Sequence, residues 1–162
     1  MSTTHLMIIS DHDALRWVVT EQRMAFPTGR SKLAQSVNEG DEVLLYTTRG
    51  CFRNPTRDRG RLMGRATVSS PVRALPKPLR LAERSFSDGC SLNIHSLAQW
   101  REGLVLSDLV PQLQVFPDPA AWSVRMRTAA LLLPAADAHL LRAAVAPFLH
   151  PYLEIVEAYR QA

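Results

Sequence analysis

The sequence has little cysteine and no long apolar run, and both shortages limit what the protein can be. Its 162 residues include only Cys51 and Cys90, too few for a disulfide framework and without the spacing of a zinc site. No apolar run reaches the roughly 18 residues that a membrane-spanning helix needs. No Lys or Arg precedes the short apolar run Leu6–Ile9, as it would in a secretory signal peptide. We therefore expect a cytoplasmic protein that does not bind membranes.

The sequence also lacks the short motifs that carry common kinds of catalysis and cofactor binding. It contains no GxxxxGK[ST], no GxGxxG after a strand, no GxSxG and no HExxH. The histidines are scattered without metal-ligand spacing: His5, His12, His95, His139 and His150. We expect no metal site, no cofactor and no catalytic residues, because acid–base chemistry needs a placed partner for each of these groups.

Apolar residues make up 46% of the chain and charged residues 21%, which is typical of a folded domain and excludes a disordered segment. A length of 162 residues fits one domain of ordinary size. We therefore expect a single domain over residues 1–162, with a C-terminal helix that begins near residue 152.

Basic residues are strongly clustered. Lysine is scarce, with two residues against 17 arginines, and ten of these 19 basic residues lie between Arg49 and Arg84. Only Asp58 and Glu83 oppose them there, so this stretch carries a net charge of +8 and the remainder carries −4 of the total of +4. A basic stretch in an otherwise acidic chain is typical of a protein that binds a polyanion.

The hydrophobic pattern predicts strands first and helices last. An irregular segment is expected over 21–29, and an edge strand or extended connection over 71–78. Strands are predicted over residues 5–10, 42–48, 62–69 and 91–95, and helices over 31–38, 137–149 and 152–160. This order indicates an α+β fold with a mainly antiparallel sheet or small barrel, because alternating βαβ units are not seen.

The loop from Arg49 to Arg61 interleaves five arginines with Phe52. Guanidinium groups fit phosphates bidentately, and an aromatic ring could stack on a base. We predict that the loop contacts a nucleic-acid backbone through Arg49, Arg53, Arg57, Arg59 and Arg61. The alternative is a solvated loop that keeps the protein soluble. Cys51 lies between two of these arginines, and burial is a simpler interpretation than an activated thiol.

Most aromatic residues fall in or beside the predicted strands, where core packing is the simplest interpretation. Phe26 and Phe52 differ because they lie in polar segments that contain Gly or Pro. A large apolar side chain in such a segment either closes the edge of a core or lines a pocket.

Several segments together resemble the PUA-like superfamily, and within it the EVE domain, a relative of YTH and ASCH domains. The resemblance rests on a first strand that ends in Ser10-Asp11, on Phe26, and on a Gly-Asp turn followed by a strand. That turn and strand cover Gly40–Thr48. The resemblance also includes the next strand, Leu62–Val68, and the segment before the last strand, with Leu106–Leu113 and Trp122. It covers roughly residues 5–149. It implies a curved antiparallel or mixed sheet, or pseudo-barrel, flanked by helices, with a pocket for one flipped base.

The resemblance also implies roles for individual residues. Ser10 and Asp11 match the position of base-edge contacts. Phe26 matches a cage aromatic, where YTH relatives have Trp. The pocket floor would be Tyr46, Thr47 and Thr48, with the arginine-rich loop at the mouth. Trp17 and Trp122 are either pocket walls or core.

The leading hypothesis is a non-catalytic module that binds DNA or RNA and accommodates a modified base in an aromatic pocket. A second hypothesis is a small hydrolase of ASCH type that acts on modified nucleosides. Such sites use a Lys, a Thr and a Glu, and here neither Lys32 nor Lys77 lies on a strand next to a Glu. A third hypothesis is a protein-interaction domain whose arginine-rich face meets an acidic partner.

Overall fold

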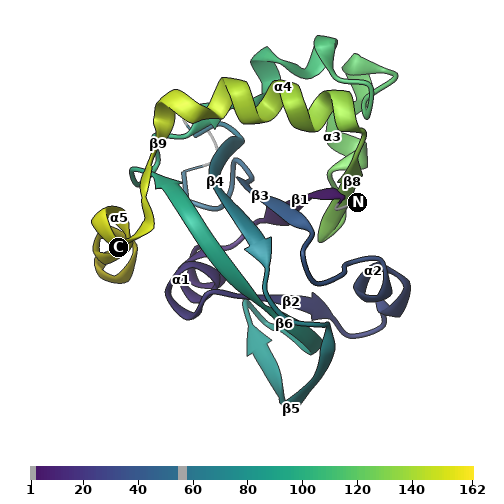
Figure 1. The fold of residues 1–162 in the computed structure, drawn as a ribbon, viewed down its shortest axis with the longest axis vertical. Helices are drawn as coiled ribbons and strands as arrows, with labels where there is room; N and C mark the ends of the chain where they lie inside the picture. Colours follow the sequence, from purple (N-terminus) through teal and green to yellow (C-terminus); the bar gives the residue numbers. More distant parts are fainter. Residues whose placement is uncertain (1–2, 55–57) are drawn as a thin grey trace.

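The fold is a strongly bent mixed sheet with helices on its outer sides (Figure 1). The computed structural model describes residues 3–54 and 58–162. The strands are β1 (Thr4–Ile9), β2 (Arg23–Pro27), β3 (Glu42–Thr47), β4 (Arg61–Val68), β5 (Arg73–Leu81), β6 (Arg84–Ala98), β7 (Leu104–Val105), β8 (Ala130–Leu133) and β9 (Leu149–Pro151). The α-helices are α1 (His12–Glu21), α2 (Ser31–Gln35), α3 (Trp122–Arg125), α4 (Ala135–Val145) and α5 (Tyr152–Gln161). Short 3₁₀ turns cover Leu106–Asp108, Val110–Gln112, Pro119–Ala121 and Ala146–Phe148.

The strand order is β2-β6-β4-β3-β1-β8, with β5 and β9 also paired to β6 and β7 paired to β4. Only the β1–β3 pair is parallel among the described strands, and the others are antiparallel. Register shifts in the β3–β4 and β4–β6 pairs increase the local twist. The sheet therefore curls into a half-barrel, which confirms the predicted α+β fold with a curved, mixed sheet.

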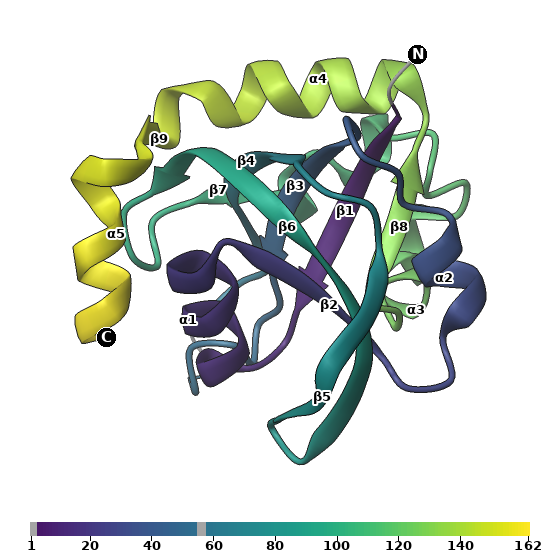
Figure 2. The same ribbon diagram turned by 60° about the horizontal axis from the view of Figure 1, so that its bottom comes forward.

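The long strand β6 connects two parts of the molecule. Its C-terminal half pairs with β4 and its N-terminal half with β2 and β5. Figures 1 and 2 both show the hairpin of β5 and β6 projecting from the body of the domain. Ala82 and Glu83 form its tight turn, with φ of 51° and 63°. β5 is largely exposed, so this arm adds little to the core.

Both faces of the central strands are buried, which explains why β3 is almost continuously apolar. On one face Val43 and Leu45 pack with α1 and with Tyr159 of α5. On the other face Leu44 and Leu62 pack with α4, which lies across the top of the sheet in Figure 1. Where β4 pairs with β3 and β6, a Cβ on Gly64 would lie 2.8 Å from Leu97 Cδ2 and 2.9 Å from Ser96 O, so the close approach of β4 and β6 needs a residue without a side chain at this position.

One local expectation was wrong, and three predicted elements have other bounds. Residues 23–27 form strand β2, although 21–29 had been expected to be irregular. The predicted helix over 31–38 ends at Gln35, and the one over 137–149 spans Ala135–Val145. The predicted strand over 91–95 is only the middle of β6. Antiparallel pairing explains the strand differences, because partners distant in sequence supply hydrogen bonds that no local pattern encodes.

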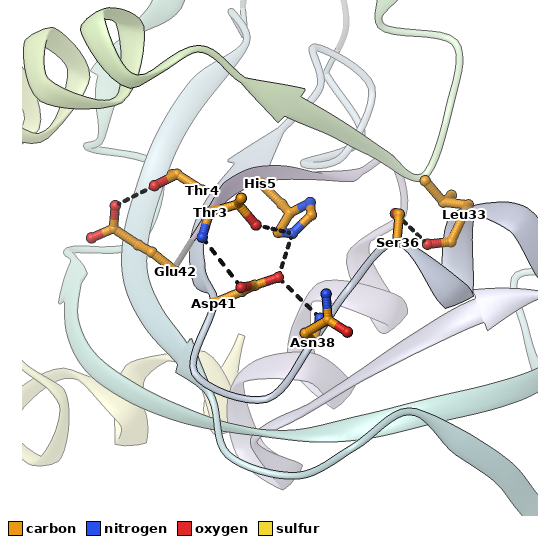
Figure 3. A network of polar contacts seen from close by, with 8 residues as sticks. All are labelled: Thr3, Thr4, His5, Leu33, Ser36, Asn38, Asp41 and Glu42. Atoms are coloured by element: carbon orange, nitrogen blue, oxygen red, sulfur yellow. Dashed lines mark hydrogen bonds and ion pairs between the residues drawn. The ribbon is translucent and has the colours of Figure 1, made fainter. Parts of the chain in front are cut away.

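Polar contacts join the first residues of β1 to the turn before β3 (Figure 3). The buried carboxylate of Asp41 accepts hydrogen bonds from the backbone N–H groups of Thr3 (3.2 Å) and Asn38 (2.9 Å). Its Oδ2 also lies 2.9 Å from Nε2 of buried His5. Burial acts to raise the pKa of Asp41, but these hydrogen bonds together lower it. The ionised carboxylate therefore ties the two strands together.

Glu42 forms the next contact along this edge. Its Oε1 accepts from Thr4 Oγ1 (3.1 Å) and Arg142 Nε (2.7 Å), and its Oε2 accepts from Arg65 Nη2 (2.7 Å). Burial opposes ionisation, yet the two guanidinium groups lower the pKa of Glu42. Arg142 belongs to α4, so this carboxylate also fastens that helix to the sheet.

Among the described residues, no helix is long and apolar enough to cross a membrane.

Candidate functional site

A cavity of about 340 Å³ opens where the parallel strands β1 and β3 end. Ile9 pairs with Thr47 at this edge, and the backbone N–H of Thr48 donates to Ile9 O (2.9 Å). Further walls come from α1, β2, the tip of the β5–β6 hairpin and the segment 126–129. The first cavity is lined by Met7, Ile8, Ile9, Ser10, Asp11, Ala14, Trp17, Val18, Ala25, Pro27, Arg30, Thr48, Leu81, Ala82, Arg84, Phe86, Met126, Arg127, Thr128 and Ala129. Apolar walls with a few polar groups are usual for a small-molecule or base pocket.

Four of the residues expected at a base pocket line this first cavity: Ser10, Asp11, Trp17 and Thr48. Asp11 also caps α1, because its Oδ2 accepts from the backbone N–H groups of Asp13 (2.9 Å) and Ala14 (3.0 Å). Both bonds end on Oδ2, so Oδ1 is not needed for the cap. The helix cap thus holds the carboxylate in place at the cavity wall.

Phe26 does not line the cavity. Its side chain is completely buried in the core, whereas its neighbours Ala25 and Pro27 face the cavity. Successive side chains of a strand point to opposite faces, and β2 turns Phe26 inward. Phe26 is therefore not placed to act as a cage aromatic in this cavity. The aromatic residues that line the cavity are Trp17 and Phe86.

A second cavity of about 670 Å³ adjoins the first. The two share Thr48, Met126 and Arg127. The second cavity is lined by Tyr46, Thr48, Arg49, Gly50, Arg59, Gly60, Ser107, Trp122, Ser123, Met126 and Arg127. Residues expected in one pocket are thus divided between two, and Trp17 and Trp122 line different cavities. Thr47 lines neither, because it is fully buried with its Oγ1 directed at Arg61 O (3.4 Å).

Tyr46 forms part of the wall of the second cavity. Burial raises the pKa of its hydroxyl to about 12, so the phenol is neutral at physiological pH. A Cβ built on Gly60 would collide with this hydroxyl. Glycine at position 60 therefore leaves the space that the Tyr46 ring and its hydroxyl occupy.

The arginine-rich loop is anchored by its apolar residues. Cys51 and Phe52 are buried, and the Phe52 ring packs edge-on against Trp100 with centroids 5.0 Å apart. Burial raises the pKa of the Cys51 thiol to about 12, which is the opposite of an activated thiolate. These anchors fix the N-terminal part of the loop, while Arg49 and Arg59 remain exposed.

The five arginines expected at a nucleic-acid backbone have different surroundings. Arg49 and Arg59 line the second cavity. Arg53 is exposed and lies 3.6 Å from an oxygen of Asp13. Arg61 donates to Gly103 O (2.8 Å) and lines neither of the two cavities. Arg57 lies outside the described residues.

Sequence reasoning missed three basic residues of the first cavity. Arg30 comes from the loop before α2, Arg84 is the first residue of β6, and Arg127 comes from the segment before β8. Arg84 carried a signal, because it ends the basic stretch. Arg30 and Arg127 lie outside that stretch, and no local pattern marks them. Folding therefore brings arginines from three separate segments to one cavity.

The described residues contain no group of three or more His, Cys, Asp and Glu side chains placed to hold a metal ion. Lys32 and Lys77, the lysines that an ASCH-type site would require, line neither cavity. The groups around the cavities can supply stacking surface, hydrogen bonds and positive charge.

The fold is similar to that of several solved structures. The human THYN1 protein, crystallised with DNA containing 5-methylcytosine, matches with a TM-score of 0.56 and 10% identity over 88% of this chain and 96% of that one. The YTH domain-containing protein mmi1, in a complex with RNA, matches with a TM-score of 0.57 and 12% identity over 89% of this chain and 81% of that one. The DUF55 domain of human thymocyte nuclear protein 1 has a TM-score of 0.54 and 11% identity over 87% and 97%.

This chain has the PUA-like fold of EVE and YTH domains. At these identities the similarity establishes the fold and leaves the ligand to be argued from the residues. No protein-family model matches the sequence, and no curated protein matches it significantly. Within the EVE/YTH-like fold, the first cavity lies where strand β1 ends and α1 begins.

Proposed function

We propose that this EVE/YTH-like domain is a nucleic-acid-binding module that accommodates a flipped, modified base in the first cavity. One observation carries the proposal: a mainly apolar cavity is lined by two aromatic side chains and by arginines from three separate segments. A flipped base needs stacking surface inside and phosphate-binding groups at the rim. Two of the named neighbours support the same class of ligand, because the THYN1 protein is described with 5-methylcytosine DNA and mmi1 with RNA.

Binding would divide the work among three kinds of side chain. Trp17 and Phe86 would supply aromatic surface for the base. Ser10, Asp11 and Thr48 would accept or donate hydrogen bonds at its edge, as base-reading pockets do. A methyl substituent would gain apolar contact worth about 0.8 kcal/mol. Reading such a base is a matter of shape and hydrogen bonding, so we propose neither a cofactor nor a catalytic step.

The test is a titration of the protein with fluorescent oligonucleotides that differ in one base. Methylated, hydroxymethylated and unmodified strands of DNA and RNA are compared at about 50 and 200 mM salt, because phosphate contacts weaken with salt. We expect one modified base to bind more tightly than its unmodified form, and Trp17→Leu to remove that difference.

The control for Trp17→Leu is Leu153→Ala, a change at an exposed residue of α5 that lines neither cavity. Leu153→Ala should keep the discrimination. Thermal melting of both variants checks that they remain folded. Binding that depends on neither salt nor modification would contradict the proposed function.

A further inference from the structure

The second cavity has the composition of a nucleotide site. Tyr46, Trp122 and Met126 give it aromatic and apolar surface, and Arg49, Arg59 and Arg127 give it positive charge. No acidic residue occurs among its described lining residues. Trp122 is half-buried and packs edge-on against Phe116, with centroids 5.8 Å apart. The Phe116 ring therefore fixes the position of the Trp122 indole, and part of the indole remains accessible to solvent.

The arginines of this cavity differ from many others in the protein. Several other arginines are within ion-pair distance of a carboxylate: Arg53, Arg65, Arg101, Arg142 and Arg160. Within the described part of the chain, no such carboxylate partner is found for Arg49, Arg59 or Arg127. All three are exposed. An anionic ligand would meet guanidinium groups that the fold does not neutralise.

The two cavities are neighbours that share one wall. Thr48, Met126 and Arg127 line both of them. Consecutive nucleotides of a strand are joined by a single phosphodiester, so a strand with one base in the first cavity must leave it past some part of its rim. The shared wall offers a guanidinium group and a hydroxyl at that point, and both bind phosphate oxygens well.

We infer that the second cavity binds the nucleotide adjacent to the flipped base, on one side of it only. The neighbouring base would lie against Trp122, Arg127 would contact the phosphate between the two nucleotides, and Arg49 and Arg59 would contact the next phosphate. This inference rests on the proposed function of the first cavity. It deepens that function, because the recognised unit becomes a dinucleotide with a defined direction.

The experiment compares a mononucleotide with its two dinucleotide extensions. The probes carry 5-methylcytosine, 5-hydroxymethylcytosine or N6-methyladenine, as DNA and as RNA. Each is used alone or with one nucleotide added at its 5′ or its 3′ side, and the added nucleotide carries a terminal phosphate at its outer end. Affinities are measured by calorimetry. One extension should bind about tenfold more tightly than the mononucleotide, since stacking of a base on an aromatic side chain has effects of this order. The other extension should add little.

Three variants locate the gain. Trp122→Leu should remove the gain on extension and leave mononucleotide affinity unchanged. The double variant Arg49→Gln/Arg59→Gln should reduce the same gain, and because both side chains are exposed it keeps the test valid if Trp122→Leu does not fold. Arg125→Gln is the matched control, since Arg125 is exposed near this site but lines neither cavity; it should behave like the parent.

The outcomes separate the two proposals. If modified probes bind through the first cavity but the gain persists in Trp122→Leu and in the double arginine variant, the second cavity is not a nucleotide site. Equal gains from the 5′ and 3′ extensions would also overturn the one-sided site. If no probe shows discrimination of the modified base that Trp17→Leu removes, the proposed function fails, and the inference fails with it.

Discussion

The two ends of the parallel strand pair β1–β3 use polar residues in opposite ways. At the N-terminal end, the carboxylates of Asp41 and Glu42 receive hydrogen bonds from surrounding donors, and Asp41 is buried. At the C-terminal end, Ser10, Thr48 and Arg127 line open cavities. Satisfied buried polar groups specify a structure, whereas polar groups beside an apolar cavity are available to a ligand. The comparison predicts that changes at the first end alter stability and changes at the second alter binding.

The largest effect is expected for Asp41→Asn. The amide keeps the size of the carboxylate but loses its charge and directs N–H groups at other donors, so we expect a loss of about 2–3 kcal/mol in the free energy of unfolding. Urea denaturation measures it. The matched control is Asp13→Asn in the first turn of α1, just after the other end of β1, where the exposed side chain should change stability by less than about 0.5 kcal/mol. Equal losses in the two variants would remove the contrast between the ends.

At the cavity end, Ala25→Met should weaken binding of the preferred modified oligonucleotide about tenfold or more. Ala25 lines the first cavity, so the longer side chain occupies space that the base would need. Fluorescence anisotropy measures the affinity. Ala74→Met on exposed β5 is the control and should bind like the parent. Unchanged affinity in Ala25→Met would show that the base does not enter this cavity.

The pH dependence of stability should come from the N-terminal end of the strand pair. Because the pKa values of Asp41 and Glu42 are lowered in the folded state from 3.8 and 4.5, their stabilising effect is complete above the unfolded pKa values and is lost as pH falls through the folded ones. Urea denaturation between pH 6 and 3 should show stability falling with acidification. The double variant Asp41→Asn/Glu42→Gln should be less stable at pH 6 but less sensitive to acid. An unchanged acid sensitivity would assign the effect to other groups.

The smallest effect is expected for Arg84→Gln at the start of β6, next to the hairpin turn. Removing one phosphate contact should weaken all oligonucleotides about equally and reduce the slope of log affinity against log salt by about 1. Binding titrations at several salt concentrations measure it. Arg160→Gln on α5 is the control, because Arg160 pairs with Glu157 and lines neither cavity. A loss of base discrimination in Arg84→Gln would show that Arg84 contributes to recognition of the base and does not only contact a phosphate.

Much of the fold could be predicted from local patterns. The strand over residues 42–48 and the two C-terminal helices were recognisable because their apolar spacing is regular. Strand β2 was missed because it is short and contains Pro27, and its hydrogen bonds come from β6, more than 50 residues away. The alternation of side chains along β2 also decided the position of Phe26. A strand directs successive side chains to opposite faces, and Phe26 points to the face that is buried in the core.

The candidate site could be predicted only in part. Ser10, Asp11 and Thr48 were predicted from the family resemblance, which places base contacts at the ends of the strands predicted over 5–10 and 42–48, and all three line the first cavity. Arg30 and Arg127 were missed because they are almost 100 residues apart and neither belongs to a local cluster. The division of these residues between two cavities was missed because the order of aromatic residues in the sequence does not show which of them lie close together in space.

By itself, the sequence determined the α+β class, the apolar strands of the centre and the excess of positive charge between Arg49 and Arg84. These depend on short-range periodicity and composition, which are local properties. The tertiary structure alone decided that Phe26 lies in the core and that Trp17 and Trp122 line separate cavities. It also brought Arg30, Arg84 and Arg127 to the first of these cavities. The physical reason is that pairing register and sheet curvature set which side chains meet, and both arise from contacts between distant segments.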